Sequence, residues 1–175
     1  MKFLWIALSI LAVLLVLITL LFAYRSWRAQ EAVPDLGVDG AGRLKPCPSS
    51  PNCVSSQAAG GRRAMEAWRF APSLAVSDVQ RALREASERV GNVQWLSESG
   101  DGAYLHGVFR SRLFRFPDDV EFFIDREKHV IHFRSASRVG KSDLGANRQR
   151  MERIRGELAR LIGEAAESGE GDPKG

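Results

Sequence analysis

The hydrophobic positions of this chain form one long uncharged run, followed by shorter segments in which apolar and polar residues alternate regularly. The run begins at Phe3 and ends at Tyr24, and none of its 22 residues is charged. At about 1.5 Å per residue, a helix of this length crosses the roughly 30 Å hydrocarbon core of a bilayer. The sequence therefore predicts an N-terminal transmembrane helix, with residues 1–28 forming the anchor and its flanks.

A cleaved secretory signal is the alternative interpretation of this run. The apolar region of such a signal usually has about 7 to 15 residues and precedes a small-x-small cleavage site. Here the run is longer and no Ala-x-Ala follows it, which favours an uncleaved anchor. Lys2 at one end opposes Arg25 and Arg28 at the other, so the positive charges are nearly balanced and do not decide the orientation.

The periodic segments that follow predict one α+β domain. Residues 29–46 are small, polar and glycine-containing, which is typical of a flexible linker. A capping box of Ser77 and Gln80 begins a helix that Gly91 ends, and a second helix carries apolar residues at three- and four-residue steps after Gly140. Alternating or turn-bounded apolar residues predict five strands, in residues 64–71, 93–97, 103–109, 119–125 and 129–138.

The order strand, helix, four strands, helix predicts an antiparallel sheet of about five strands with both helices packed on one face. We expect this domain to span residues 47–166 and a disordered tail to follow in residues 167–175. The last two strands predict a hairpin with Glu127 and Lys128 at its tip. Its register pairs Ile124 with Ile131, Phe122 with Phe133, Val120 with Ser135, Phe123 with His132, Glu121 with Arg134, and Asp119 with Ala136.

Charge argues against a nucleic-acid partner. The whole chain has a formal net charge of +4 and a pI near 9.4. Without Lys2, Arg25 and Arg28 of the anchor, however, 22 basic side chains stand against 21 acidic ones. The domain is therefore nearly neutral and lacks the broad basic surface that binding to a phosphate backbone requires.

The two cysteines predict a disulfide. Cys47 and Cys53 are the only cysteines, and the five residues between them include two prolines and an asparagine that bend the backbone. In an oxidising compartment a disulfide closing so short a loop contributes about 2 to 2.5 kcal/mol. A metal site needs two further ligands, and His106, His129 and His132 lie far along the chain, so we expect neither a metal site nor another cofactor. A catalytic thiol is a further alternative, although redox pairs more typically read Cys-x-x-Cys.

The charged residues of the hairpin have a structural and a functional interpretation. The structural one is mutual pairing, as for Glu121 with Arg134, which contributes about 0.2 to 1 kcal/mol per exposed pair. The functional one is a polar cleft in which the candidate catalytic residues Asp118, Asp119 and Glu121 perform acid/base chemistry and arginines hold an anion. Perturbed charges also occur in ordinary ion-pair networks, so the structural interpretation is favoured.

The beginning of the last helix carries a second set of candidates. Ser142 or Asp143 is expected to cap this helix, which leaves Arg148 and Arg150 near its first turns. Basic residues there oppose the helix dipole and call for an acidic partner or a bound anion. The candidate ligand-binding residues are therefore Arg134, Arg138, Asp143, Asn147, Arg148 and Arg150.

Three motifs in order resemble a family catalogued as domain of unknown function 1499, which occurs in bacteria and in plastid-bearing organisms. They are LKPCPSSPNCVSSQ (residues 44–57), FPDDVE (residues 116–121) and RSASRVGKSDLGANRQR (residues 134–150). The resemblance covers residues 44–162, and Lys141 departs from it where many relatives have an aromatic or hydrophobic residue. Members often carry an N-terminal export or membrane segment, which implies a domain outside the cytoplasm. The resemblance implies no activity and no catalytic residue.

These observations predict a single-pass protein of the inner (plasma) membrane whose domain lies on the extracytoplasmic side. We expect this domain to bind a protein partner or an amphipathic or lipidic ligand at the cell envelope. One alternative is an envelope hydrolase or transferase that acts on an anionic substrate through the Asp, Glu and Arg cluster. Another is a scaffold of a membrane complex.

Overall fold

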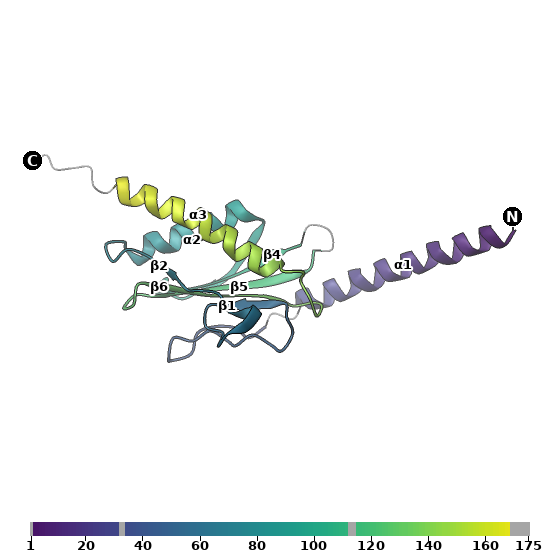
Figure 1. Ribbon diagram of the computed structural model, residues 1–175, viewed down its shortest axis with the longest axis horizontal. Coiled ribbons are helices and arrows are strands. Elements are labelled where there is room, and N and C mark those ends of the chain that lie inside the picture. The colour runs from purple at the N-terminus through teal and green to yellow at the C-terminus, as the bar shows by residue number, and fades with distance from the viewer. Residues whose placement is uncertain (1, 32–33, 112–114, 169–175) are drawn as a thin grey trace, which may run out of the picture.

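A computed structural model describes residues 2–31, 34–111 and 115–168 of the chain. A long N-terminal helix projects from a domain in which two helices cover one face of a sheet (Figure 1). This is the α+β architecture that the sequence predicts. The elements are α1 (Lys2–Glu31), β1 (Cys53–Ser55), the 3-10 helix η1 (Gly61–Arg63), β2 (Trp68–Arg69), α2 (Val76–Val90), β3 (Val93–Glu98), β4 (Tyr104–Arg110), β5 (Pro117–Asp125), β6 (Val130–Ser137) and α3 (Ala146–Ser168).

The strands pair antiparallel in the order β1-β6-β5-β4-β3, and β2 also pairs with β6. β5 and β6 form the predicted hairpin, and every residue pair predicted for it is present. The prediction succeeds because side chains alternate strictly along a strand, so a shift by one residue would turn the apolar set of β5 away from the helices.

The short strands β1 and β2 pair with the same edge of β6, and here the strands differ from those that the sequence predicts. β1 pairs with residues 134–136 of β6 and was not predicted. The strand predicted over residues 64–71 is confined to Trp68–Arg69, which pair with residues 130–131. Upstream of it, Ala64 and Met65 contact Ser55 of β1 instead, and the Met65 N–H donates to the Ser55 carbonyl at 3.2 Å. β1 and β2 thus pair with separate stretches of the same edge of β6, residues 134–136 and 130–131.

The capping box predicted for α2 is also wrong. The helix begins at Val76 with Ala75 as N-cap, and no side chain caps it. The Ala75 carbonyl accepts the Val79 N–H at 3.1 Å, so Ser77 lies inside the first turn and not before it. The predicted end is confirmed, because the Gly91 N–H bonds to the carbonyl of Ser87.

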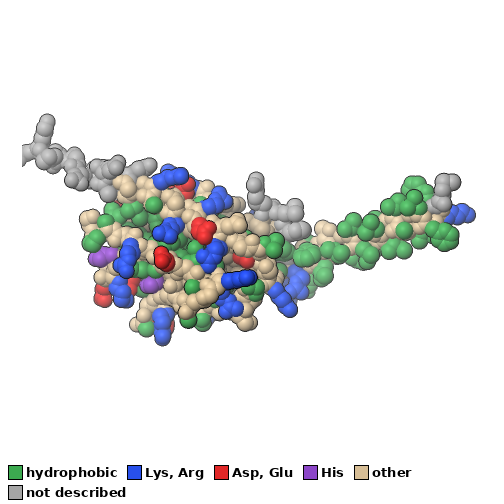
Figure 2. Space-filling model, in the orientation of Figure 1, with side chains coloured by type: hydrophobic (Ala, Val, Ile, Leu, Met, Phe, Trp, Pro, Cys, Tyr) green, Lys and Arg blue, Asp and Glu red, His purple; other side chains and the backbone are tan. Residues whose placement is uncertain are grey.

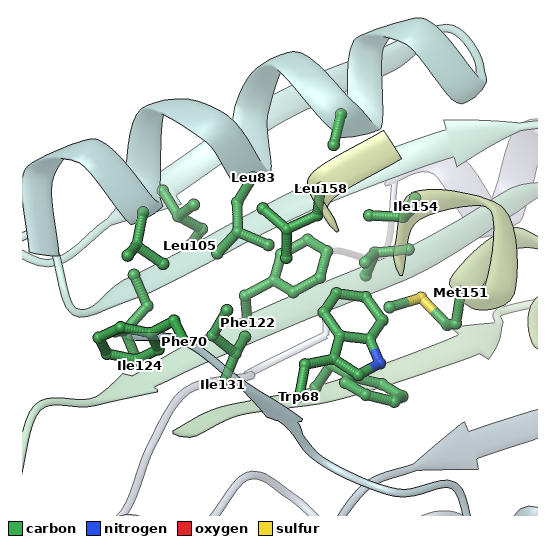
Figure 3. Packing of buried hydrophobic residues seen from close by; sticks show 14 of the residues in the cluster. Trp68, Phe70, Leu83, Leu105, Phe122, Ile124, Ile131, Met151, Ile154 and Leu158 are labelled. Atoms are coloured by element: carbon green, nitrogen blue, oxygen red, sulfur yellow. The ribbon is translucent and has the colours of Figure 1, made fainter. Parts of the chain in front are cut away.

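The hydrophobic core lies between the two helices and the sheet (Figure 3). From β2, Trp68 stacks on Phe133 of β6 with 4.4 Å between ring centroids. The helices and the central strands contribute the other large buried side chains, which include Leu83, Leu105, Phe122, Ile124, Ile131, Met151, Ile154 and Leu158. Full burial of one such side chain contributes about 1.5 to 3 kcal/mol, so this layer is the main source of stability.

The opposite face of the sheet is covered by the segment between α1 and β2 (Figure 1). Leu44 is buried, and its N–H donates to Gln57 Oε1 at 2.8 Å. Gly42 has a positive φ of 73° and lies so close to Phe123 that a Cβ there would be 3.1 Å from the ring. Part of the predicted linker thus packs on the sheet. The predicted domain limits stay a prediction, and residues 169–175 of the predicted tail lie outside the described residues.

Helix α1 is apolar from Phe3 to Tyr24, and the large hydrophobic side chains of this stretch are exposed (Figure 2). The stretch Lys2–Arg25 is long and apolar enough to cross a membrane, a test that a signal sequence near the N-terminus also passes. Close to its domain-side end, the ring of Phe22 lies 6.0 Å from the ring of Phe116, which directly precedes β5. The end of the apolar helix therefore touches the domain.

Candidate functional site

The predicted pair of Glu121 and Arg134 lies on the sheet face opposite the helices. Arg134 Nη1 donates to Glu121 Oε2 at 3.1 Å, and both side chains are buried. The second carboxylate oxygen accepts the Tyr104 hydroxyl at 2.9 Å and the Gly37 N–H at 3.2 Å. Burial raises the pKa of Glu121 above its usual range, although the Arg134 charge opposes this shift. This carboxylate of β5 thus contacts β4 through Tyr104, β6 through Arg134, and the segment that follows α1 through Gly37.

Asp119 forms a second buried cluster on the same face. Arg138 donates to both carboxylate oxygens, from Nε at 2.8 Å and from Nη2 at 2.7 Å. His106 Nε2 lies 2.8 Å from Oδ1. Burial raises the pKa of Asp119, but the hydrogen bonds from Arg138 and His106 outweigh it and hold the pKa below its usual range. Asp119 is therefore ionised at neutral pH, and both of its carboxylate oxygens have partners.

Asp118 lies on the helix-covered face and has different partners. Its Oδ2 accepts Arg150 Nη2 of α3 at 2.5 Å. Arg150 also donates to Asn147 Oδ1 at 2.6 Å, which in turn accepts the Ser135 hydroxyl. Adjacent residues of a strand point to opposite faces, so Asp118 is separated from Asp119 and Glu121 by the sheet itself. The three candidate catalytic carboxylates do not line one cleft.

The remaining predicted ligand-binding residues tie α3 to its neighbours. Asp143 accepts the Asn147 N–H at 2.8 Å and so caps the helix, as predicted for Ser142 or Asp143. Asn147 is fully buried and donates to the carbonyl of Asn52 at 3.0 Å. Arg148 donates to the carbonyls of Arg62 and Ala64. The basic residues at this helix start thus have partners within the fold, an acidic one for Arg150 and carbonyl oxygens for Arg148.

The disulfide joins Cys47 and Cys53, with 5.7 Å between their Cα atoms. It closes the loop that leads into β1. Asn52 within this loop donates to the Gly140 carbonyl at 2.7 Å, so the loop is also bonded to the segment before α3. Among the described residues, no group of three or more His, Cys, Asp or Glu side chains could hold a metal ion.

A pocket of about 670 Å³ opens between the end of α2, the end of β4 and the start of α3. We call it the arginine pocket, because four of the residues that line it are Arg110, Arg115, Arg150 and Arg153. No Asp or Glu is among the described residues lining it. The guanidinium of Arg150 is fixed by Asp118 and by the ring of Phe109, which lies 4.9 Å from its Cζ.

One arginine that lines this pocket has an unpaired donor. Arg110 Nη1 is buried beneath the surface and has no hydrogen-bond partner among the described residues. Arg153, which is exposed, donates to the carbonyl of Val90 at 3.3 Å. Guanidinium groups form strong charge-assisted hydrogen bonds with anionic oxygens, and four of them line this pocket. The arrangement is suited to holding an anionic group.

Sequence reasoning identified only Arg150 of this set. The available signal was the alternation of Arg with Phe from Phe109 to Phe116, together with Arg150 and Arg153 three residues apart on one helix face. These segments are distant in the sequence, and only the packing of α3 beside the end of β4 brings them together. Arg112 of the same run lies outside the described residues.

Comparison with known proteins gives one family. The family model described as protein of unknown function (DUF1499) matches residues 43–158, which confirms the resemblance seen in the three sequence motifs. No curated protein and no solved structure matches the chain. The matched range contains both buried carboxylate clusters, the disulfide and the arginine pocket.

Proposed function

This chain belongs to the DUF1499 family of proteins of unknown function, and we propose that it is a single-pass membrane protein whose domain binds an anionic ligand at the membrane surface. The observation that carries the proposal is the arginine pocket, which four arginines line and which has no Asp or Glu among its described lining residues. Its volume of about 670 Å³ is within the range of small-molecule sites and suits a compact anionic group better than a flat protein surface.

Membrane anchoring is supported by α1 and its contact with the domain. A side chain of the apolar run, Phe22, packs against Phe116, and the segment after the helix bonds to the sheet through Gly37 and Glu121. These contacts favour a helix that stays attached over a signal that is removed. The charged clusters of the sheet do not favour an enzyme, because Asp118, Asp119 and Glu121 each have basic partners within the fold.

The disulfide supports a domain on the extracytoplasmic side, because disulfides persist in oxidising compartments and are rare in the cytosol. Cells are first quenched with acid, so that free thiols cannot oxidise after lysis. The membranes are then isolated and denatured, and we expect Cys47 and Cys53 to react with a maleimide only after treatment with a reductant. Ready labelling without reductant would argue against both the disulfide and the extracytoplasmic position.

Anion binding is tested with inorganic phosphate and the full chain in uncharged detergent micelles. Phosphate at about ten times its Kd should stabilise the domain by about 1.4 kcal/mol, which raises Tm by several degrees relative to chloride of the same ionic strength. The double variant Arg110→Gln/Arg153→Gln should lose this shift, because it removes two guanidinium groups from the pocket.

The matched control is Arg81→Gln/Arg160→Gln, which removes the same charge from exposed positions of α2 and α3 outside the pocket. This control should keep the full phosphate shift. If phosphate raised Tm equally in the wild type and in both double variants, or in none of the three, the proposed anion site would be refuted.

A further inference from the structure

We infer that the arginine pocket holds the phosphate of an anionic phospholipid headgroup, taken from the leaflet that surrounds the domain-side end of α1. This inference rests on the proposed anion binding and names the source of the anion. It follows from the depth at which the pocket lies relative to the apolar helix, and from the charge of the groups that line it.

The contact of Phe22 with Phe116 sets the depth. Phe22 lies two residues before Tyr24, where the uncharged run ends, so it is about 3 Å from that end along the helix axis. Tyr and Trp residues at the ends of spanning helices lie at the level of the lipid headgroups, so Tyr24 marks this boundary next to Phe22. Because its ring centroid is 6.0 Å from that of Phe22, Phe116 lies at the same boundary.

The arginine pocket begins next to this contact. Arg115 directly precedes Phe116 and lines the pocket. Ser111, another lining residue, donates its N–H to the Phe116 carbonyl at 3.0 Å and accepts the Phe116 N–H on Oγ at 2.9 Å. Arg110 is paired with Pro117 across β4 and β5. The backbone thus holds Arg110 and Arg115 close to Phe116, where the domain contacts α1.

The arrangement of elements agrees with this depth. In Figure 1 the end of β4 and the start of α3 lie on the side of the domain that meets the C-terminal end of α1. A headgroup of the surrounding leaflet can therefore reach the pocket without its lipid leaving the bilayer. Tethering by α1 gives such a headgroup a high effective concentration at the pocket.

The lining chemistry selects among headgroups. A phosphodiester offers several acceptor oxygens, which match the planar donor forks of the guanidinium groups that line the pocket. A choline group would bring a further cation among four arginines, and no Asp or Glu is among the described lining residues to receive it. Phospholipids with a net negative charge are therefore preferred over zwitterionic ones.

The test uses the full chain in nanodiscs made of equal amounts of phosphatidylglycerol and phosphatidylcholine. After release from the nanodiscs, the lipids that remain bound are identified and counted by native mass spectrometry. The wild type should retain phosphatidylglycerol in about tenfold preference, an effect of the size expected for one or two basic residues at an anionic surface. The double variant Arg110→Gln/Arg153→Gln should retain the two lipids about equally.

Two further variants keep the result interpretable. Arg153 is exposed, so Arg153→Gln alone should fold normally and still lower the preference. The control Arg81→Gln/Arg160→Gln should keep the wild-type preference. An unchanged preference in the folded pocket variants, or an equal loss in the control, would overturn the lipid inference.

The phosphate titration separates this inference from the proposed function. A pocket-dependent phosphate shift without any preference for phosphatidylglycerol would leave the anion site standing and refute the lipid source. The absence of both effects would remove both proposals.

Discussion

Replacing Glu121 by alanine should destabilise the domain by about 3 to 5 kcal/mol, because it leaves the buried charge of Arg134 without its carboxylate. The side chain of Arg134 is 9% exposed, so little water can replace the lost partner. Its Nε already has no partner among the described residues. The measurement is unfolding of the full chain in mild detergent, followed by near-ultraviolet circular dichroism of the buried aromatic side chains.

The double variant Glu121→Leu/Arg134→Met should recover much of this loss, because apolar side chains of similar volume carry no charge that requires a partner. The control is Lys128→Ala, which removes an ion pair with Asp125 at the end of the same strand. The side chain of Lys128 is 73% exposed, so we expect a change of about 0 to 1 kcal/mol. If Glu121→Ala were as mild as Lys128→Ala, the Glu121 pair would not be part of the structural core.

Replacing Asp119 by asparagine should destabilise the domain by about 2 to 4 kcal/mol at neutral pH, because charge-assisted hydrogen bonds from Arg138 and His106 are lost or weakened. This difference should depend on pH. The folded-state pKa of Asp119 is lowered, so its stabilising contribution is complete above the ordinary value of about 3.9. It is lost as the pH falls through the lower folded-state pKa.

Asparagine does not titrate, so the gap in stability between wild type and Asp119→Asn should narrow below about pH 4. Unfolding of both proteins at neutral and acid pH measures this gap. Asp35→Asn is the control, because Asp35 is 99% exposed and its replacement should change stability by no more than about 0.5 kcal/mol. A gap that stays constant from neutral to acid pH would contradict the assignment of Asp119 as an ionised partner.

The Glu121 and Asp119 variants test function as well as stability. The carboxylates that the sequence offered as candidate catalytic groups are used to hold β5 to its neighbours and to the segment after α1. The Glu121 and Asp119 variants should therefore lower stability, while those that fold should keep the phosphate and lipid responses of the arginine pocket. The variant Arg153→Gln should show the opposite pattern, because Arg153 is exposed and contributes little to the fold.

The sequence by itself determined the features that depend on short stretches of chain. The apolar run of α1 requires only length and the absence of charge. The register of β5 and β6, including the pair of Glu121 with Arg134, follows from the two-residue alternation of side chains along a strand. The disulfide needs only two cysteines and a loop that can close between them.

Only the tertiary structure decided the features that join distant segments. β1 was invisible in the sequence because its three residues are too short for a period, and it shares the edge of β6 with the two-residue strand β2. The arginine pocket depends on how α3 packs beside α2 and the end of β4, which brings Arg110 and Arg153 to one cavity. Packing geometry of this kind is set by the whole core, and no local pattern along the chain encodes it.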